Sequence, residues 1–329
     1  MARPLRFEYP GAIYHVINRG NYRFWIFEDV KTRDAFEKCL FEACEQFGWV
    51  LHAYCVMSNH YHLALETLEP NLSAGMRWLQ STFAMRYNRY RKEHGHLFQG
   101  RFKSIVVEDT DRLAWLCHYI HLNPVRAGIV TLGRLQTYSN SSYAWLMKGK
   151  RGRPNCLRFS DMLDSVGGLK DGPVGRRKYA DYLKWLATDE PKRKEMLFER
   201  MSRGWAMGTK AFKTALLEDG KREVARRVIE GKADAEARDL IWSGRLEACL
   251  AIAGKTFKDA EREAKSMEWK VAICAYMREA WGCKVIWLSE RLNMGAAAGV
   301  SRCLRRLREG ELREARQLLE CLKRELGKS

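Results

Sequence analysis

Residue types that could act together on one phosphate occur within the first 130 residues of the chain. His60 and His62 belong to the apolar run 59–65, which is typical of a strand, and residues i and i+2 of a strand share a face. Tyr119 and Asn123 are four residues apart in a run with helical spacing, which makes them neighbours on a helix. Two imidazoles and an amide oxygen could bind a divalent metal, beside which the tyrosine could act as a nucleophile.

Each of these motifs is weak by itself, and a structural alternative exists for the histidines. His60 and His62 could be an ordinary hydrogen-bonded pair on a strand. His94 and His96 form a second His-x-His pair in the same chain, and we expect that pair to lie in an exposed loop because it flanks a glycine. The combination of the first pair with Tyr119 and Asn123 favours a functional site.

The elements around these residues predict an α+β fold. β-rich and apolar runs with turn signals beside them predict four strands, at 12–18, 50–57, 59–65 and 98–107. Helical spacing predicts helices at 31–47 and 72–91, and a third that is capped by Thr110 or Asp111 and carries Tyr119. The order β-α-β-β-α-β plus a helix is the ferredoxin-like plan, in which the first and third strands are central. We expect Pro124 to end the last helix at Asn123.

Four motifs of the chain resemble those of one transposase family. They are YHVINRGN at 14–21, MSNHYH at 57–62, FQGRFK at 98–103 and YIHLNPVRAG at 119–128. In this order they resemble the REP-associated tyrosine transposases, single-tyrosine transposases of the HUH superfamily, over about residues 5–145. Those proteins cut and rejoin hairpin-forming single-stranded DNA. The resemblance implies that His60 and His62 bind the metal, that Asn123 is the third ligand and that Tyr119 is the nucleophile.

The charge of the chain indicates a polyanionic partner. The formal net charge is +18, and a globular chain this basic most often binds nucleic acid. Segment 77–103 holds seven Lys and Arg against one acidic residue, interleaved with aromatic residues, which is the pattern of a single-strand binding surface. Within this segment we expect four side chains to contact the DNA backbone, namely Arg89, Arg91, Arg101 and Lys103.

Cysteine usage and hydropathy indicate a cytoplasmic protein. The ten cysteines form no Cys-x-x-Cys pair, which argues against a zinc ribbon or a disulfide framework and favours reduced thiols. The first ten residues lack the apolar core of a signal peptide, and no 18-residue apolar run occurs. We therefore expect a cytoplasmic protein with no membrane partner, associated with the nucleoid when it binds DNA.

The second half of the chain is expected to add binding rather than chemistry. We predict a catalytic domain at 1–147, a basic Gly-rich linker at 148–175 and a mostly helical region at 176–329 without a catalytic motif. Helices expected at 285–292 and 296–308 form a possible helix-turn-helix, in which Arg302, Arg305 and Arg306 would contact DNA. A helical hairpin with a basic solvent face is the alternative.

The leading hypothesis is a metal-dependent enzyme acting on single-stranded or hairpin DNA. Tyr119 would cleave and rejoin hairpin-containing strands through a 5′-phosphotyrosine intermediate, with Mg²⁺ or Mn²⁺ as the metal. The alternative is a non-cleaving DNA-binding regulator that recognises a sequence or a structure. An RNA-binding ferredoxin-like domain would need stacking aromatics where His60 and His62 stand. A monomer and a homodimer are both compatible with the sequence.

Overall fold

The computed structural model describes residues 6–219 and 235–326, which fall into two compact units. The first unit is Arg6–Phe212, and the second begins at Lys213. The first unit therefore extends well beyond residue 147, the predicted end of the catalytic domain.

A five-stranded sheet forms the centre of the first unit. Its strands are β1 (Ala12–Arg19), β2 (Trp49–Val56), β3 (His60–Thr67), β4 (Lys103–Val107) and β5 (Ala206–Met207), in the order β2-β3-β1-β4-β5. The first four strands pair antiparallel, whereas β5 runs parallel to β4. The predicted α+β fold is confirmed, with β1 and β3 in the interior of the sheet.

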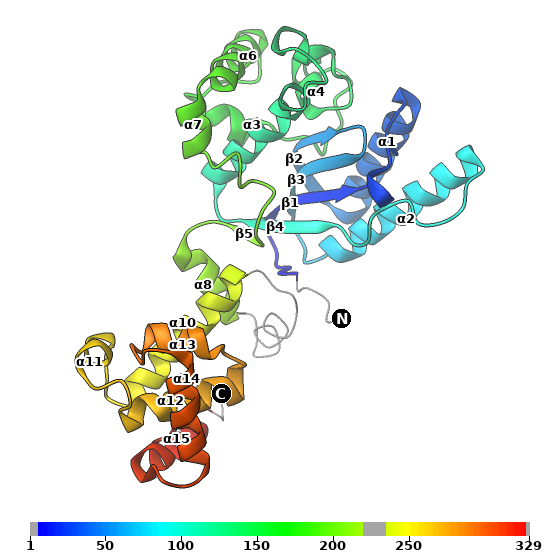
Figure 1. The fold of residues 1–329 in the computed structure, drawn as a ribbon. Coiled ribbons are helices and arrows are strands. Elements are labelled where there is room, and N and C mark those ends of the chain that lie inside the picture. Colours follow the sequence, from blue (N-terminus) through cyan, green and yellow to red (C-terminus); the bar gives the residue numbers. More distant parts are fainter. Residues whose placement is uncertain (1–5, 220–234, 327–329) are drawn as a thin grey trace. The chain divides into compact units, whose positions relative to one another are not determined.

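Helices cover both faces of this sheet (Figure 1). On one face lie α1 (Val30–Phe47) and α2 (Leu72–Arg91), which pack on each other. On the other face α3 (Thr110–Arg126) crosses β2 and β3. Further helices of the unit are α4 (Ser142–Lys148), α5 (Ser160–Asp164), α6 (Pro173–Thr188) and α7 (Glu190–Glu195), while α8 (Lys210–Asp219) spans the boundary between the units. The sheet thus has a different helical layer on each face.

The ends of the helices follow from local chemistry. The Asp29 carboxylate accepts a hydrogen bond from the backbone N–H of Thr32 at the start of α1, and Gly48 ends that helix at a φ of 64°. At the start of α3 the cap is Asp109, which accepts from the N–H of Arg112 at 2.8 Å. The predicted cap at Thr110 or Asp111 was therefore wrong by one or two residues.

Among the predicted ends that differ from the structure, two have a clear physical cause. The fourth strand begins at Lys103 instead of Phe98, because Gly100 has a φ of +66° and interrupts the extended run. Helix α3 passes through Pro124 and ends at Arg126, whereas we expected it to end at Asn123. Only one helical hydrogen bond is lost by a proline so near the end, and the Asn123 carbonyl still accepts from the N–H of Ala127 at 2.9 Å.

The segment predicted as a linker packs against the sheet. Within 148–175 the structure has helix α5, and the side chains of Phe159 and Met162 are buried. Leu157 is also buried and forms a parallel bridge with Leu51 of β2. These apolar residues stand between glycines and arginines, which is why the composition of the segment resembled that of a linker.

The second unit is helical, as predicted. Its helices are α10 (Ala235–Ile252), α11 (Phe257–Arg262), α12 (Glu268–Trp281), α13 (Val285–Arg291), α14 (Ala297–Arg308) and α15 (Arg313–Leu326). Helix α12 contacts α10, α13, α14 and α15, and it buries an apolar stripe that includes Val271, Ile273 and Met277. The core of this unit therefore forms around α12.

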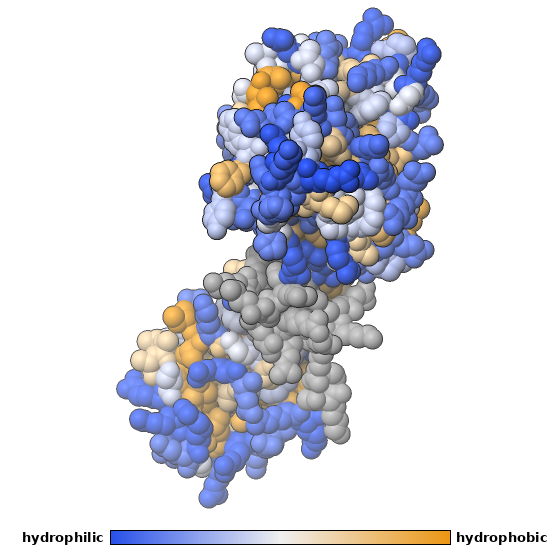
Figure 2. All heavy atoms as spheres, turned by 90° about the vertical axis from the view of Figure 1, so that its right-hand side faces the viewer, coloured by the Kyte–Doolittle hydropathy of each residue, from blue (hydrophilic) through white to orange (hydrophobic). Residues whose placement is uncertain are grey.

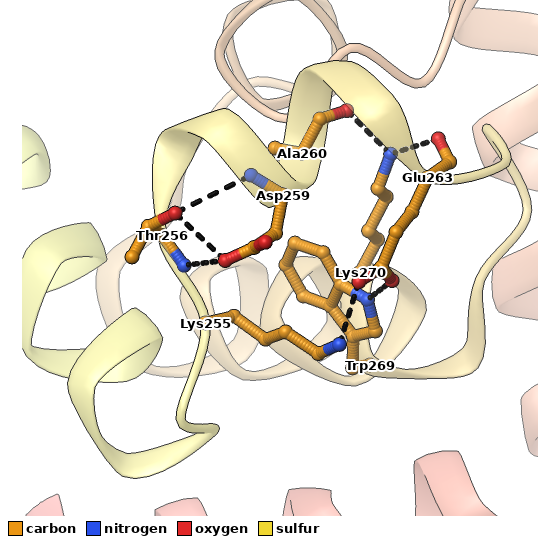
Figure 3. A network of polar contacts seen from close by, with 7 residues as sticks. All are labelled: Lys255, Thr256, Asp259, Ala260, Glu263, Trp269 and Lys270. Carbon is orange, nitrogen blue, oxygen red and sulfur yellow. Dashed lines mark hydrogen bonds and ion pairs between the residues drawn. The ribbon is translucent and has the colours of Figure 1, made fainter.

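A polar network joins α11 to α12 in the second unit (Figure 3). Thr256 and Asp259 form a reciprocal capping box at the start of α11. The buried ammonium of Lys270 donates to the carbonyl of Ala260 at 2.7 Å and to that of Glu263 at 3.0 Å. Because a buried charge is costly without such partners, this lysine has a structural role. Among the residues described, none of the helices is both long and apolar enough to cross a membrane.

Candidate active site

Strand β3 directs its two histidines to the side of the sheet where α3 lies. The rings of His60 and His62 have centroids 5.0 Å apart, and the His62 ring lies 5.8 Å from that of Tyr119 on α3. Tyr61, between them, points to the opposite layer, where its ring stacks on Phe36 at 4.7 Å and its hydroxyl accepts from Gln80. The shared face inferred from strand alternation is therefore present.

A third histidine, His15 on β1, determines which nitrogen of His62 is available. His15 Nδ1 lies 2.8 Å from the carbonyl oxygen of Met201, which can only accept, so Nδ1 carries the proton. Burial lowers the pKa of His15 to about 4, so the ring is neutral and its Nε2 is an acceptor. His62 Nδ1 donates to this Nε2 at 2.9 Å. The lone pair of His62 consequently stands on Nε2.

The neighbouring imidazole is held in the same tautomer by a different partner. His60 Nδ1 lies 2.7 Å from the amide oxygen of Asn59, so it donates, and its Nε2 keeps the lone pair. Burial lowers the pKa of His60, and burial with His15 nearby holds the pKa of His62 well below its usual range. Two neutral imidazoles with oriented Nε2 atoms are what a metal site requires, because the partners of Nδ1 set the tautomer.

Helix α3 places the tyrosine against these rings and buries it. The Tyr119 side chain is 7% exposed, and its hydroxyl lies 3.1 Å from Oγ of Ser202. The ring of Phe198 packs edge-on at 5.6 Å, and the guanidinium of Arg126 lies 4.7 Å from the tyrosine ring centroid. The nucleophile candidate is thus enclosed by residues 198–202, which precede β5.

Asn123 lies one helical turn after the tyrosine and has an unsatisfied amide. Its side chain is buried, and Oδ1 is 3.5 Å from the guanidinium of Arg126. Within the described part of the chain its Nδ2 has no hydrogen-bond partner, which is costly for a buried group. A 180° rotation of the amide would present the oxygen at this position instead.

These donors fit a divalent metal. Two Nε2 lone pairs and one amide oxygen make a mixed nitrogen and oxygen set that Mn²⁺ and Mg²⁺ accept. No group of three or more His, Cys, Asp or Glu side chains in residues 6–219 and 235–326 is arranged to hold a metal. A site at His60 and His62 therefore needs the amide of Asn123, or water, to complete it.

The far side of α3 carries a buried network that fixes the orientation of the helix. His118 and His121 both contact the hydroxyl of Tyr179 on α6 through Nδ1, at 3.1 and 2.9 Å. His121 Nε2 reaches Oγ of Ser142 at 2.8 Å. Burial lowers the pKa of each histidine to about 3, so both are neutral. The network positions the face of α3 that bears Tyr119.

Several residues at the site have no assigned role in the sequence analysis. His15 occurs in a quoted motif, and alternation along β1 could have placed it on the face of His62. Met201 and Ser202 lie outside every motif, so only the folded chain reveals them. Arg126 lies within the tyrosine motif at 119–128, seven residues after Tyr119, and helical spacing could have placed it on the face of Tyr119.

The predicted DNA-backbone residues lie at different places in the first unit. Arg89 and Arg91 are exposed at the end of α2, where Arg91 also pairs with Asp29 at 2.6 Å. Arg101 lies in the exposed segment before β4, and the ammonium of Lys103 donates to the carbonyl of Ser202 at 2.8 Å. The side of this unit that faces right in Figure 1 is mostly hydrophilic (Figure 2). Lys103 thus contacts the segment that encloses Tyr119.

The second unit contains the two helices expected for a helix-turn-helix. Helices α13 and α14 are separate, and Val300, Leu304 and Leu307 turn the apolar side of α14 into the unit. Arg302 is on the exposed side. Arg305 and Arg306 are exposed too. The Arg305 guanidinium lies 3.9 Å from the carboxylate of Glu309, and the Arg306 guanidinium lies 2.6 Å from that of Glu311. DNA contact by these arginines remains a prediction.

If α14 binds DNA, reversing two of these charges should weaken binding. We expect Arg305→Glu with Arg306→Glu to lower the slope of log K against log salt by about 0.7 to 0.9 for each lost phosphate contact. Arg313→Glu with Arg316→Glu on α15, also exposed, is the matched control. Fluorescence anisotropy with a labelled hairpin measures both. Equal affinities of the two variants for the hairpin DNA would contradict DNA binding by α14 and favour the alternative, a helical hairpin with a basic solvent face.

Comparisons with known proteins find similarity over part of the first unit. Residues 9–123 match the family model described as "Transposase IS200 like", and this range holds His60, His62, Tyr119 and Asn123. A Haemophilus influenzae protein described as a REP-associated tyrosine transposase is 26% identical over 110 residues. That match covers 30% of this chain and 62% of the relative, so it spans less than two thirds of that protein.

A solved structure is similar to part of the chain as well. It is the structure of a REP-associated tyrosine transposase bound to a REP hairpin, and it is 18% identical in sequence. The similarity covers 49% of this chain and 93% of the solved one, with a TM-score of 0.39.

Proposed function

We propose that the protein cleaves and rejoins hairpin-containing single-stranded DNA, and the match of residues 9–123 to the family model described as "Transposase IS200 like" supports this. The observation that carries the proposal is the arrangement at β3 and α3. A tyrosine hydroxyl stands beside two neutral imidazoles whose Nε2 atoms are free of the hydrogen bonds that hold the rings. This arrangement suits nucleophilic attack on a phosphodiester.

The proposed reaction exchanges one phosphate ester for another. The Tyr119 oxygen attacks phosphorus, a bond from phosphorus to that oxygen forms, and the bond to the 3′-oxygen breaks. The phenol loses its proton and the departing 3′-oxygen gains one, which leaves a 5′-phosphotyrosine and a free 3′-OH. A 3′-OH can then reverse the step and rejoin strands without an external energy source, because the ester bond is conserved.

The chain's own residues would bind and orient the participants. His60, His62 and Asn123 would hold Mg²⁺ or Mn²⁺, which supplies Lewis-acid stabilisation of phosphate charge when bound. The guanidinium of Arg126 places a permanent positive charge beside the Tyr119 ring, where the anionic phosphodiester must approach. The hydroxyl of Ser202 contacts the Tyr119 hydroxyl and restricts its rotation.

A non-cleaving DNA-binding regulator is the second candidate. The burial of Tyr119 favours it, because a phosphate cannot reach a hydroxyl that Phe198 and Ser202 enclose unless those residues move. Both candidates bind hairpin DNA, but only the enzyme forms a covalent adduct with it.

Incubation of the full chain with DNA separates these two functions. We expect a covalent adduct with labelled single-stranded hairpins taken from DNA that flanks the gene, when Mg²⁺ or Mn²⁺ is present, and much less with a fully paired linear duplex. Binding should weaken steeply with salt, with log K falling by about 0.7 per phosphate contact. Denaturing gel electrophoresis detects the adduct. Equal cleavage of the duplex would contradict the proposed substrate.

A further inference from the structure

The loop between β1 and α1 exposes aromatic side chains at successive positions. In the segment 21–28, here called the aromatic loop, Tyr22 is 81% exposed, Phe24 68% and Trp25 63%. The rings of Tyr22 and Phe24 are in edge contact at 6.4 Å. Single exposed apolar side chains are ordinary, whereas a cluster of large ones indicates a binding surface.

The backbone of this loop is strained at the same residues. Tyr22 has a φ of 51° and Arg23 a φ of 62°, so two consecutive residues other than glycine adopt the left-handed conformation. This conformation is unfavourable for a bulky side chain, and such strain occurs mainly at functional sites. The loop is therefore held in a shape that its own sequence does not favour.

A cavity of about 810 Å³ lies beside the aromatic loop and is here called the loop pocket. Its volume is in the range of small-ligand sites. The stretch 93–97 after α2 forms another part of the lining, with the imidazoles of His94 and His96. Glu28 and Glu93 also line it, together with Arg23, and their carboxylates could accept hydrogen bonds from the amino groups of nucleobases.

The aromatic loop is hydrogen-bonded to Asn59, the residue that orients the ring of His60. The amide of Asn59 donates to the carbonyl of Arg23 at 3.3 Å, and the same side chain accepts from His60 Nδ1. The backbone N–H of Gly20 also donates to the carbonyl of Asn59 at 2.8 Å. One asparagine thus contacts both the loop and His60, which places the loop next to the candidate active site.

We propose that the loop pocket binds one unpaired base of the DNA strand that enters the active site. The inference rests on the proposed function, to which it adds a base-binding subsite. The base would stack on the exposed rings of the aromatic loop. Positively charged side chains on the surface would contact the phosphates outside the pocket. Stacking on an aromatic side chain typically contributes enough to change affinity about 5- to 150-fold for each base.

Removal of the exposed rings tests this subsite in the full chain. The test variant combines Tyr22→Ala, Phe24→Ala and Trp25→Ala, and the control is Trp185→Ala, which removes an aromatic ring that is 46% exposed on α6. The probe is a fluorescent hairpin with mixed-sequence single-stranded extensions on both sides, and a series of such hairpins carries one abasic nucleotide at each position. Anisotropy over a range of salt concentrations gives the affinity and the salt slope.

We expect the triple variant to bind about 5- to 150-fold more weakly than Trp185→Ala, with an unchanged salt slope. One abasic position should weaken binding by the normal chain by a similar factor and have little effect on the triple variant. Equal thermal unfolding shows that the variant folds, and Trp25→Phe, which keeps a stacking ring, should bind more tightly than Trp25→Ala.

The outcomes distinguish the subsite from the proposed function. If the normal chain binds the hairpin but the triple variant binds it as tightly as Trp185→Ala does, the subsite is refuted and the proposed function stands. The same conclusion follows if each abasic nucleotide weakens binding by the same factor in the normal chain and in the triple variant. A reduced salt slope in the triple variant would mean that the loop holds a phosphate, which also refutes it. If the normal chain binds no single-stranded hairpin, both proposals fail together.

Discussion

Tyr119→Phe should abolish the covalent protein–DNA adduct while leaving hairpin binding almost unchanged. The substitution removes only the attacking oxygen and one hydrogen bond to Ser202, so the cost in stability is about 1 kcal/mol. Loss of a nucleophile typically lowers turnover by at least about a thousandfold. Denaturing gels measure the adduct, and anisotropy measures binding.

Tyr61→Phe is the matched control for this substitution. Tyr61 lies on the same strand as the histidines but faces α1 and α2, where its hydroxyl accepts a hydrogen bond from Gln80. Its loss should also cost about 1 kcal/mol and leave cleavage intact. An adduct formed by Tyr119→Phe at the normal rate, or lost in Tyr61→Phe, would show that another residue is the nucleophile.

Replacement of both His60 and His62 by Ala should abolish cleavage, and a chelator should do the same to the normal chain. The physical reason is the loss of both Nε2 donors that would hold the proposed metal, which would polarise the phosphate when bound. Hairpin binding should survive, because the basic residues of α2 are untouched. Cleavage assays with and without chelator, followed by addition of Mg²⁺ or Mn²⁺, measure the effect.

The two histidines differ in what their removal costs the fold. His62→Ala leaves the buried His15 Nε2 without its partner, which should cost about 1 to 3 kcal/mol, so His60→Ala is the cleaner single variant. His52→Ala is the control, because His52 is a buried strand histidine that pairs with Glu66 at 3.0 Å. It should lose stability and keep cleavage. Cleavage by the normal chain in excess chelator would contradict the proposed role of a metal in the reaction.

The parts of the fold that follow from strand alternation or helical spacing could be predicted from the sequence. Alternation from His60 to Leu65 gave the correct faces of β3, and helical spacing gave α2 with its observed ends. Both signals are local, because a side chain's face depends only on its place in its own element. The helix pair α13 and α14 was predictable for the same reason.

The features that the sequence did not predict depend on contacts between distant segments. Strand β5 has only two residues, Ala206 and Met207, which is too short for any alternation to be visible. Its place beside β4 brings residues 198–202 over α3, and nothing in their local pattern indicates this. The donor set at His60, His62 and Asn123 stays a prediction, although the tautomers and the unpartnered amide support it.

The hydrogen bond from His15 to Met201 has a consequence for the order of synthesis. The two residues are 186 positions apart in the chain, yet the tautomer of His62 depends on their contact. A growing chain on the ribosome already contains His15, His62 and Tyr119 long before Met201 emerges. Its imidazoles are then not yet oriented, because the chain that would order them has not been made. Chains that end before residue 201 should therefore lack the contact that sets the tautomer of His62.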